Sequence, residues 1–142
     1  MADQPVSEGI RALLATHVAT SGWALETGML PTTPDKVISL ADTGGQPSNP
    51  KWLLDYPQLQ VTVRGAVGGY IAAFAEAKAV KDIILGLPSQ TINDDIWDGV
   101  LMTSDVAFIG KDENERPIFT ANFNLIIEPA LVANSNRVAL NK

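Results

Sequence analysis

Several residue types that carry chemistry are absent or scarce in this chain. The 142 residues contain no cysteine, which excludes disulfide bonds, thiolate metal sites and thiol catalysis. The only histidine, His17, falls on the apolar side of the first predicted helix, where packing explains it better than catalysis does. With one histidine and no thiol, a zinc site is all but excluded.

Charged residues and long apolar runs are scarce too. Charged residues make up 18% of the chain and apolar residues 46%, which indicates a substantial core and favours a subunit that covers part of its surface with copies of itself. The longest apolar runs fall well short of the roughly 18–20 residues that cross a bilayer, and the N-terminus lacks the pattern of a secretory signal. We therefore expect a soluble protein made in the cytoplasm, with no membrane partner.

The net charge of −6 is concentrated toward the C-terminal side, where residues 89–142 carry eight acidic and four basic side chains. Tight binding to nucleic acid rests on Lys and Arg that displace counterions from phosphates. The charge therefore argues against a nucleic-acid regulator.

Apolar spacing predicts the secondary structure. One helix is expected between a cap at Ser7 and a stop at Gly22, and a second from about Tyr70 to Leu85. Strands are expected at residues 37–41, 59–63, 91–93, 96–103 with a continuation at 106–110, and 119–127, with loops at residues 23–34 and 46–57. The order α-β-β-α-β-β-β predicts an α+β fold with two helices on one face of a mostly antiparallel sheet. We expect residues 1–129 to form one domain and residues 130–142 to form a polar C-terminal tail or arm.

The predicted loop at residues 46–57 is unusually apolar. It contains Trp52, Leu53, Leu54 and Tyr56. Large apolar groups in a loop need a cover, which is either their own domain or a neighbouring subunit.

Three other stretches superficially match functional motifs. Residues 65–69 are glycine-rich and lie between a strand and a helix, but they fit neither phosphate-binding pattern, and backbone turning explains the glycines. The acidic run at residues 112–115 lacks the glycine and the spaced final Glu of a calcium loop, so a hairpin tip is the better interpretation. Asp94 and Asp95, with Asp98 nearby, are adjacent residues that favour a turn over a glycosidase carboxylate pair.

Five groups of short motifs lie in order between residues 8 and 129. They are Asp42-Thr43-Gly44-Gly45 with Asn49-Pro50-Lys51; Asp55-Tyr56-Pro57 with Gln60-Val61-Thr62-Val63-Arg64-Gly65; Gly68-Gly69-Tyr70 opening an Ala-rich helix to Lys81-Asp82; Asp112-Glu113-Asn114 with Arg116-Pro117; and Asn122-Phe123-Asn124-Leu125-Ile126 with Glu128-Pro129. Together they resemble the tail terminators of tailed bacteriophages, a family also described as minor capsid or tail completion proteins.

The resemblance implies a structural α+β subunit of the virion with no catalytic residue, metal or cofactor. Six copies would form a ring on the head-proximal end of the tail tube, stop its polymerisation and meet the connector beneath the capsid. DNA would pass through the ring without sequence-specific contacts. The alternatives are another neck component, such as a head-completion or stopper protein, or a small enzyme or ligand-binding module with a pocket that gathers His17 and two carboxylates.

Two site hypotheses follow from a ring around DNA. Arg64, together with the apolar residues of the 46–57 loop, is our candidate for a contact between subunits, and the alternative for Arg64 is an ordinary surface arginine. Acidic side chains in the lumen would repel phosphates and let DNA slide. The candidates for that lining are Asp94, Asp95, Asp98, Asp112, Glu113 and Glu115.

Overall fold

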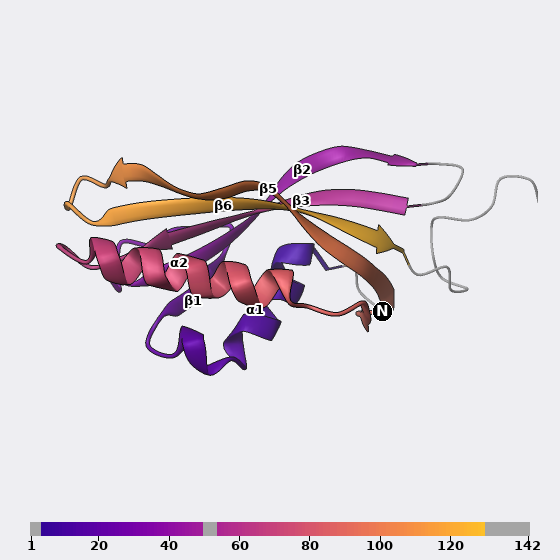
Figure 1. Ribbon diagram of the computed structural model, residues 1–142, viewed down its shortest axis with the longest axis horizontal. Coiled ribbons are helices and arrows are strands. Elements are labelled where there is room, and N and C mark those ends of the chain that lie inside the picture. The colour runs from indigo at the N-terminus through magenta and orange to yellow at the C-terminus, as the bar shows by residue number, and fades with distance from the viewer. Residues whose placement is uncertain (1–3, 50–53, 130–142) are drawn as a thin grey trace, which may run out of the picture.

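Two helices cover one face of a six-stranded mixed sheet, which makes a two-layer α+β domain (Figure 1). The computed structural model describes residues 4–49 and 54–129. The elements are, in chain order, α1 (Val6–Ala15), the 3-10 helix η1 (Val18–Thr20), β1 (Ala24–Thr27), β2 (Val37–Asn49), β3 (Leu54–Arg64), α2 (Tyr70–Leu85), β4 (Gln90–Ile92), β5 (Asp95–Lys111) and β6 (Pro117–Glu128). The predicted fold class is confirmed. The predicted tail at residues 130–142 lies outside the described residues.

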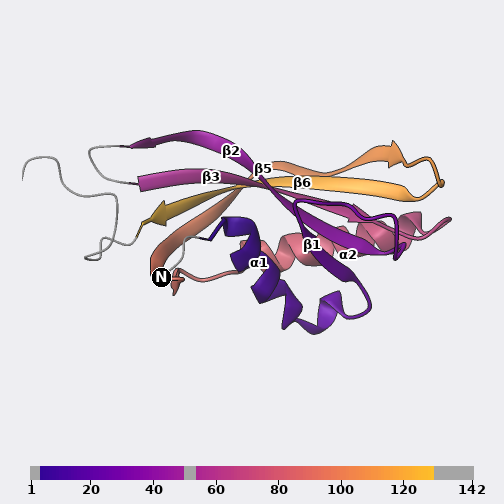
Figure 2. The same ribbon diagram turned by 180° about the vertical axis from the view of Figure 1, so that it is seen from behind.

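The core lies between the helices and the sheet face that they cover. Alternate residues of the central strands β3 and β6 point into it, as the period of a strand requires, and the paired strands carry Val63 opposite Phe119 and Leu59 opposite Phe123. Helix α1 contributes Ile10 and Leu14. Figure 2 shows α1 in front of α2, so the two helices lie side by side beneath the sheet.

The second helix was predicted with both of its ends, whereas the first is shorter than predicted. α2 runs from Tyr70 to Leu85. α1 ends at Ala15, so His17 lies beyond it and is exposed rather than packed in the core. There the His17 Nδ1 accepts a hydrogen bond from the Ala19 N–H at 3.2 Å and caps η1.

The predicted strand order is wrong because it omits β1. Sequence analysis assigned residues 23–34 to a loop, but Ala24–Thr27 pair in parallel with Val37–Leu40 at the edge of the sheet. Four residues carry too little pattern to predict a strand, so the assignment depends on a partner distant in the chain. The sheet order is β1-β2-β3-β6-β5-β4, with every pair antiparallel except β1 and β2.

The predicted loop at residues 46–57 is wrong over most of its length. β2 continues to Asn49 and β3 begins at Leu54, so the two strands extend beyond the helices as a long hairpin (Figures 1 and 2). The strand was predicted to stop at residue 41. Asp42 to Gly45 instead form an irregularity in the pairing of β2 with β3, and β2 continues beyond it. Gly45 has a φ of +95°, and a Cβ there would lie 2.2 Å from the Tyr56 carbonyl oxygen, so only glycine lets β2 pass this point.

The last three strands form two hairpins of different length. Asn93 and Asp94 both have positive φ and form the two-residue turn between β4 and β5, one residue earlier than predicted. β5 is a single strand of 17 residues where two shorter ones were predicted, and its register with β6 shifts at four places. These bulges let one strand bend along the whole length of the sheet.

Candidate assembly surfaces

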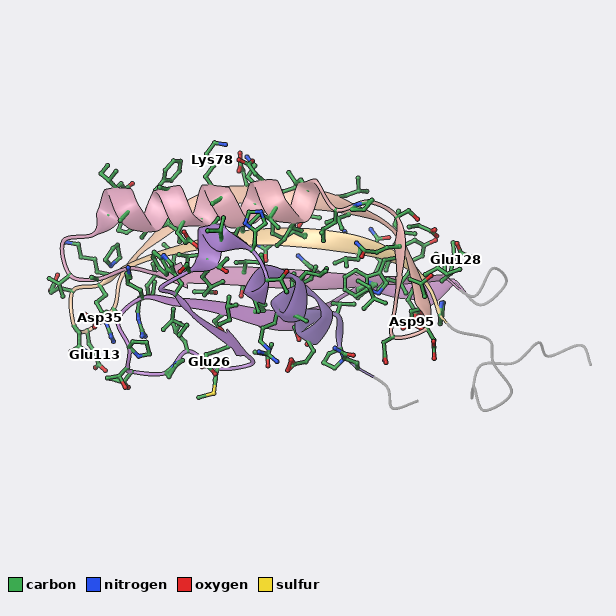
Figure 3. The ribbon with its side chains drawn as sticks, turned by 90° about the horizontal axis from the view of Figure 1, so that it is seen from below. Glu26, Asp35, Lys78, Asp95, Glu113 and Glu128 are labelled. Atoms are coloured by element: carbon green, nitrogen blue, oxygen red, sulfur yellow. The ribbon has the colours of Figure 1, made fainter. Side chains whose placement is uncertain are left out.

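The structure divides the six predicted channel residues into two groups of three. Asp94, Asp95 and Asp98 lie at the β4–β5 turn, and the others lie at the β5–β6 turn. Figure 3 shows Asp95 with Glu128 at one end of the molecule and Glu113 at the other. β5 separates the groups along its whole length, so one subunit cannot present them as a single patch.

The first acidic group includes a carboxyl pair that sequence analysis did not find. A hydrogen bond with Asp98 and the negative charge of that residue raise the pKa of Glu128. β6 ends beside the start of β5, where Glu128 is opposite Ile96 and the register shifts at Asp98. This pairing follows from strand register, which the sequence does not reveal.

In the second group, Asp112 organises the β5–β6 turn. Its Oδ1 accepts hydrogen bonds from the backbone N–H groups of Asn114 and Arg116, each at 2.9 Å, and its Oδ2 accepts one from Arg116 Nε at 2.8 Å. Partial desolvation acts to raise the pKa of Asp112, but these bonds outweigh it and lower the pKa. Asp112 is therefore a structural residue, whereas Glu113 and Glu115 are exposed.

Arg64 and Arg116 are both buried and hold the connection between β1 and β2. Arg64 is 2% exposed and donates to the Asp35 carbonyl at 3.0 Å and the Pro34 carbonyl at 2.7 Å. Arg116 is 4% exposed and donates through Nη1 to the Thr32 carbonyl at 2.6 Å and the Asp35 carboxylate at 3.0 Å. Burial, followed by repulsion from Arg116, lowers the pKa of Arg64.

These bonds bear on the predicted role of Arg64. It is not the surface arginine of the alternative hypothesis, because its guanidinium lies within the subunit. It points away from the helices, since its neighbour Val63 points toward them, and the connection between β1 and β2 therefore crosses the far face of the sheet. A contribution to a subunit contact stays a prediction and would act through this connection.

The apolar residues predicted at the interface are only partly described. Leu54 and Tyr56 lie at the start of β3 and are half-buried. Trp52 and Leu53 lie outside the described residues. Leu54 and Tyr56 lie where β3 extends with β2 from the end of the sheet. The role of the four residues at a subunit contact stays a prediction.

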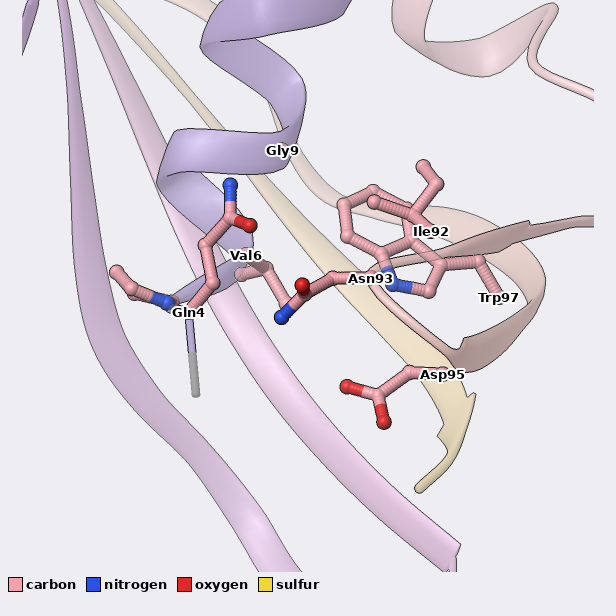
Figure 4. Close-up of a pocket in the computed structure, with 8 residues that line it drawn as sticks. Gln4, Val6, Gly9, Ile92, Asn93, Asp95 and Trp97 are labelled. Atoms are coloured by element: carbon pink, nitrogen blue, oxygen red, sulfur yellow. The ribbon is translucent and has the colours of Figure 1, made fainter. Parts of the chain in front are cut away.

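A shallow pocket lies between the start of α1 and the β4–β5 turn (Figure 4). The Trp97 ring packs beneath α1 so closely that a Cβ on Gly9 would lie 2.8 Å from it. The lining contains a single carboxylate, and His17 does not contribute to it, so this pocket does not have the composition expected for the enzyme alternative. The lining residues are Gln4, Pro5, Val6, Gly9, Ile92, Asn93, Asp95 and Trp97.

Residues 4–49 and 54–129 contain neither a group of metal-ligating side chains nor a helix that could span a membrane. In these ranges no three His, Asp or Glu side chains lie close enough to hold a metal ion together. No helix in the same ranges has both the length and the apolar composition needed to cross a membrane.

A cluster of four aromatic side chains lies beside the start of α2 and is partly exposed. The Phe119 ring is buried, and the rings of Tyr70, Phe74 and Phe108 surround it at centroid distances of 5.0, 5.8 and 5.4 Å. The outer three rings are each more than 40% exposed. Their apolar spacing in the sequence predicts that Tyr70 and Phe74 belong to the buried stripe of α2, but the structure leaves both half exposed.

Comparison with known proteins places this fold in a family. A sequence model described as bacteriophage tail terminator protein matches residues 17–129, which is most of the chain. The chain belongs to the bacteriophage tail terminator family. The resemblance inferred from the short motifs is thereby confirmed, and the chain is a structural protein of the phage tail.

Solved structures show the same fold. One of them is a chain from a structure described as the virion of a native gene transfer agent (GTA) particle. Its TM-score to this chain is 0.73 and the sequence identity is 16%. The match covers 87% of this chain and 95% of the other chain. At this identity the likeness is one of fold. No curated protein sequence matches the chain.

Proposed function

We propose that this protein forms a homohexameric ring at the head-proximal end of the tail tube, where it ends tube polymerisation and joins the tail to the head connector. The observation that carries the proposal is the match to the tail terminator family over residues 17–129. The role is structural and non-enzymatic, and it needs no cofactor. The exposed apolar side chains of the subunit support assembly, because contiguous apolar surface exposed to water is typical of protein–protein interfaces.

The positions of the acidic residues support a modified version of the channel-lining hypothesis. Because the two groups lie at opposite ends of the subunit, a ring whose subunits lie with their long axis along the channel would carry acidic side chains at two levels rather than in one band. Carboxylates at either level repel phosphates. We retain Asp94, Asp95, Asp98, Glu113 and Glu115 as candidates for contact with the channel.

The first test is the state of the purified protein over a wide range of concentration. Sedimentation should give a species of six subunits, and negative-stain images should show closed rings with a central hole. Addition of the tail tube protein from the same genome should then give tubes that stop growing in proportion to the ring added. Tubes of unchanged length in the presence of excess protein would overturn the terminator role.

DNA passage is tested separately by neutralising one acidic group at a time. A triple variant with Asp94→Asn, Asp95→Asn and Asp98→Asn is compared with a double variant that carries Glu113→Gln and Glu115→Gln. Asp112 is left intact because it organises its turn. Slower DNA ejection from particles with normal rings supports the channel role for the neutralised group. Normal ejection in both variants would contradict the channel role of both groups.

A further inference from the structure

The outward side of α2 is apolar over its first turns, whereas farther along it carries the exposed Lys78–Asp82 pair. Ile71 is 76% exposed, Val67, four residues before it, is 64% exposed, and the half-exposed rings of Tyr70, Phe74 and Phe108 adjoin them. We call these five residues the α2 patch. Three half-exposed aromatic rings with two aliphatic side chains reach the size, about 300–600 Å², of the largest apolar patch on a typical monomer, which is often functional.

The aromatic part of the α2 patch is already packed within the single subunit. Tyr70 and Phe108 contact each other edge to face with centroids 5.0 Å apart, and both contact the buried ring of Phe119. Aromatic anchors supported from beneath lose little conformational entropy on binding, as in the energetic centres of protein interfaces.

A second, smaller apolar surface lies on the other side of the molecule. Met29 and Leu30 follow β1 and are 53% and 39% exposed. β1 is an edge strand, and no strand among residues 4–49 and 54–129 pairs with its outer side. We call β1 together with Met29 and Leu30 the β1 edge.

The two surfaces face away from each other. α2 packs under β6 and β5, whereas β1 is at the opposite end of the strand order. In Figure 3, α2 with Lys78 forms one long side of the molecule, and Glu26 of β1 lies on the other. Copies placed side by side in one orientation would therefore bring the α2 patch of one toward the β1 edge of the next.

Symmetry decides which occupant fits this arrangement. A two-fold dimer uses the same patch on both copies, whereas a ring is built from two different patches that meet head to tail. The chain has two different apolar patches on opposite sides, with a cation beside one and an anion beside the other. Lys78 and Glu26 carry opposite charges and would then lie at the rim of the contact, although Lys78 is also paired with Asp82 within α2.

We infer that the α2 patch of one subunit binds the β1 edge of the next copy of this chain, and that this contact closes the ring. The inference rests on the proposed function, since it names the surfaces through which the ring would form. The other occupant of the α2 patch, the tail tube protein, is an outcome of the test.

The test uses one charged variant on each surface. Ile71→Asp damages the α2 patch, and Met29→Asp damages the β1 edge; both side chains are more than half exposed, so the fold should tolerate them. Leu101→Asp is the matched control, because Leu101 is 60% exposed but follows Val100 on β5 with its side chain on the far face. Circular dichroism and thermal unfolding confirm that each variant is folded.

Sedimentation over a range of concentrations measures assembly. Each interface variant should shift assembly to concentrations about tenfold higher or more, while Leu101→Asp assembles as the unmodified protein does. A mixture of Ile71→Asp and Met29→Asp should give dimers and no rings. One intact contact forms between the two variants, and the remaining free surfaces are both damaged. A two-fold contact through the α2 patch would instead let Met29→Asp form dimers without its partner variant, because that change leaves the α2 patch intact.

The outcomes separate this inference from the proposed function. If the unmodified chain forms rings and both interface variants form them equally well, the named surfaces are wrong while the ring stands. If Ile71→Asp forms normal rings that no longer stop tube growth, the α2 patch binds the tube protein, and the inference is again wrong. If the unmodified chain forms no ring either alone or with tube protein, the proposed function fails and the inference falls with it.

Discussion

The two helices cover the same sheet face, but their sides that face the solvent differ. None of the large apolar side chains of α1 is exposed, whereas α2 exposes Tyr70, Ile71, Phe74 and Leu85. The helices also differ in their buried polar groups. Ser7 of α1 is fully bonded, but Glu76 of α2 has one carboxylate oxygen without a hydrogen-bond partner in the described part of the chain.

This difference shows how each side of the subunit is stabilised. The α1 side, which includes β1 and its connection to β2, is held by buried hydrogen bonds and ion pairs to distant strands. The α2 side relies on apolar packing and leaves part of its apolar surface exposed. We therefore expect changes to the buried polar groups of the α1 side to affect the stability of the subunit, and changes to exposed apolar side chains, on α2 or at Met29 and Leu30, to affect assembly.

The largest loss of stability is expected from Arg116→Met. This change removes the guanidinium that holds Thr32 and Asp35 of the β1–β2 connection and leaves the Asp112 carboxylate without its cation. Breaking a buried ion pair from one side costs several kcal/mol, and we expect a loss of about 3 kcal/mol in the free energy of unfolding because Asp35 is partly solvated. Urea denaturation measures it.

Lys111→Met is the control for that prediction. Lys111 belongs to the same hairpin, is 55% exposed and lies 3.9 Å from Glu115. An exposed pair of this kind contributes about 0.5 kcal/mol or less. Equal losses for the two variants would show that the connection is not held by Arg116.

The next loss is expected from Asp42→Ala, which separates α1 from β2. The Asp42 carboxylate accepts hydrogen bonds from the Ser7 N–H at 3.2 Å and the Ser7 hydroxyl at 2.7 Å, and so caps the first turn of α1 from a strand. Its loss leaves two buried donors without a partner, at a cost of about 2 kcal/mol. Asp82→Ala on α2 is the comparison, because its ion pair with Lys78 is exposed and the change should cost under about 0.5 kcal/mol.

A smaller loss is expected from Gly9→Ala, where α1 lies against Trp97. The new methyl group would lie 2.8 Å from the indole ring, which belongs to the core and cannot move freely. Overpacking of this kind costs about 1–2 kcal/mol. Gly99→Ala, on the same strand as Trp97, has open space around its Cβ and serves as the control in the same denaturation series. If Gly9→Ala leaves the free energy of unfolding unchanged, the packing of α1 against Trp97 is looser than the 2.8 Å distance implies.

The parts of the fold that could be predicted are those with local signals. α2 was predicted with both ends because its apolar spacing lies between Gly69 and Gly86. β1 could not be predicted, since it exists through parallel pairing with β2. The glycines and proline within β2 are typical of a turn, and only the structure shows that they form a bulge in a continuing strand.

The candidate surfaces were harder to predict than the fold. The acidic residues between Asp94 and Glu115 were grouped because they are near in sequence, and the 17 residues of β5 place them at opposite ends. Tyr70 and Phe74 have the spacing of buried residues, and the width of the sheet above them decides how much of each ring is covered. Phe108 joins them only through the register of β5 with β6.

The smallest expected change in the free energy of unfolding concerns Glu76, the buried carboxyl of α2, and it tests how the two helices differ in their buried polar groups. Burial raises its pKa above the ordinary value of 4.5, although Lys36 acts in the opposite direction. The folded state then binds the proton more tightly than the unfolded state, so this residue favours folding most at pH below about 4.5. That contribution is lost as the pH rises through the raised pKa.

Glu76→Gln removes the charge while keeping the shape of the side chain. We expect it to raise the free energy of unfolding by about 1 kcal/mol at pH 8, where the unmodified carboxyl is ionised without a full set of partners, and to change little at pH 4.5. Urea denaturation at both pH values measures the difference. A gain of equal size at both would attribute the effect to packing rather than to charge. A loss at pH 8 would show that Lys36 or another group compensates the carboxylate, so that both helices bury only satisfied polar groups and differ in their outward faces alone.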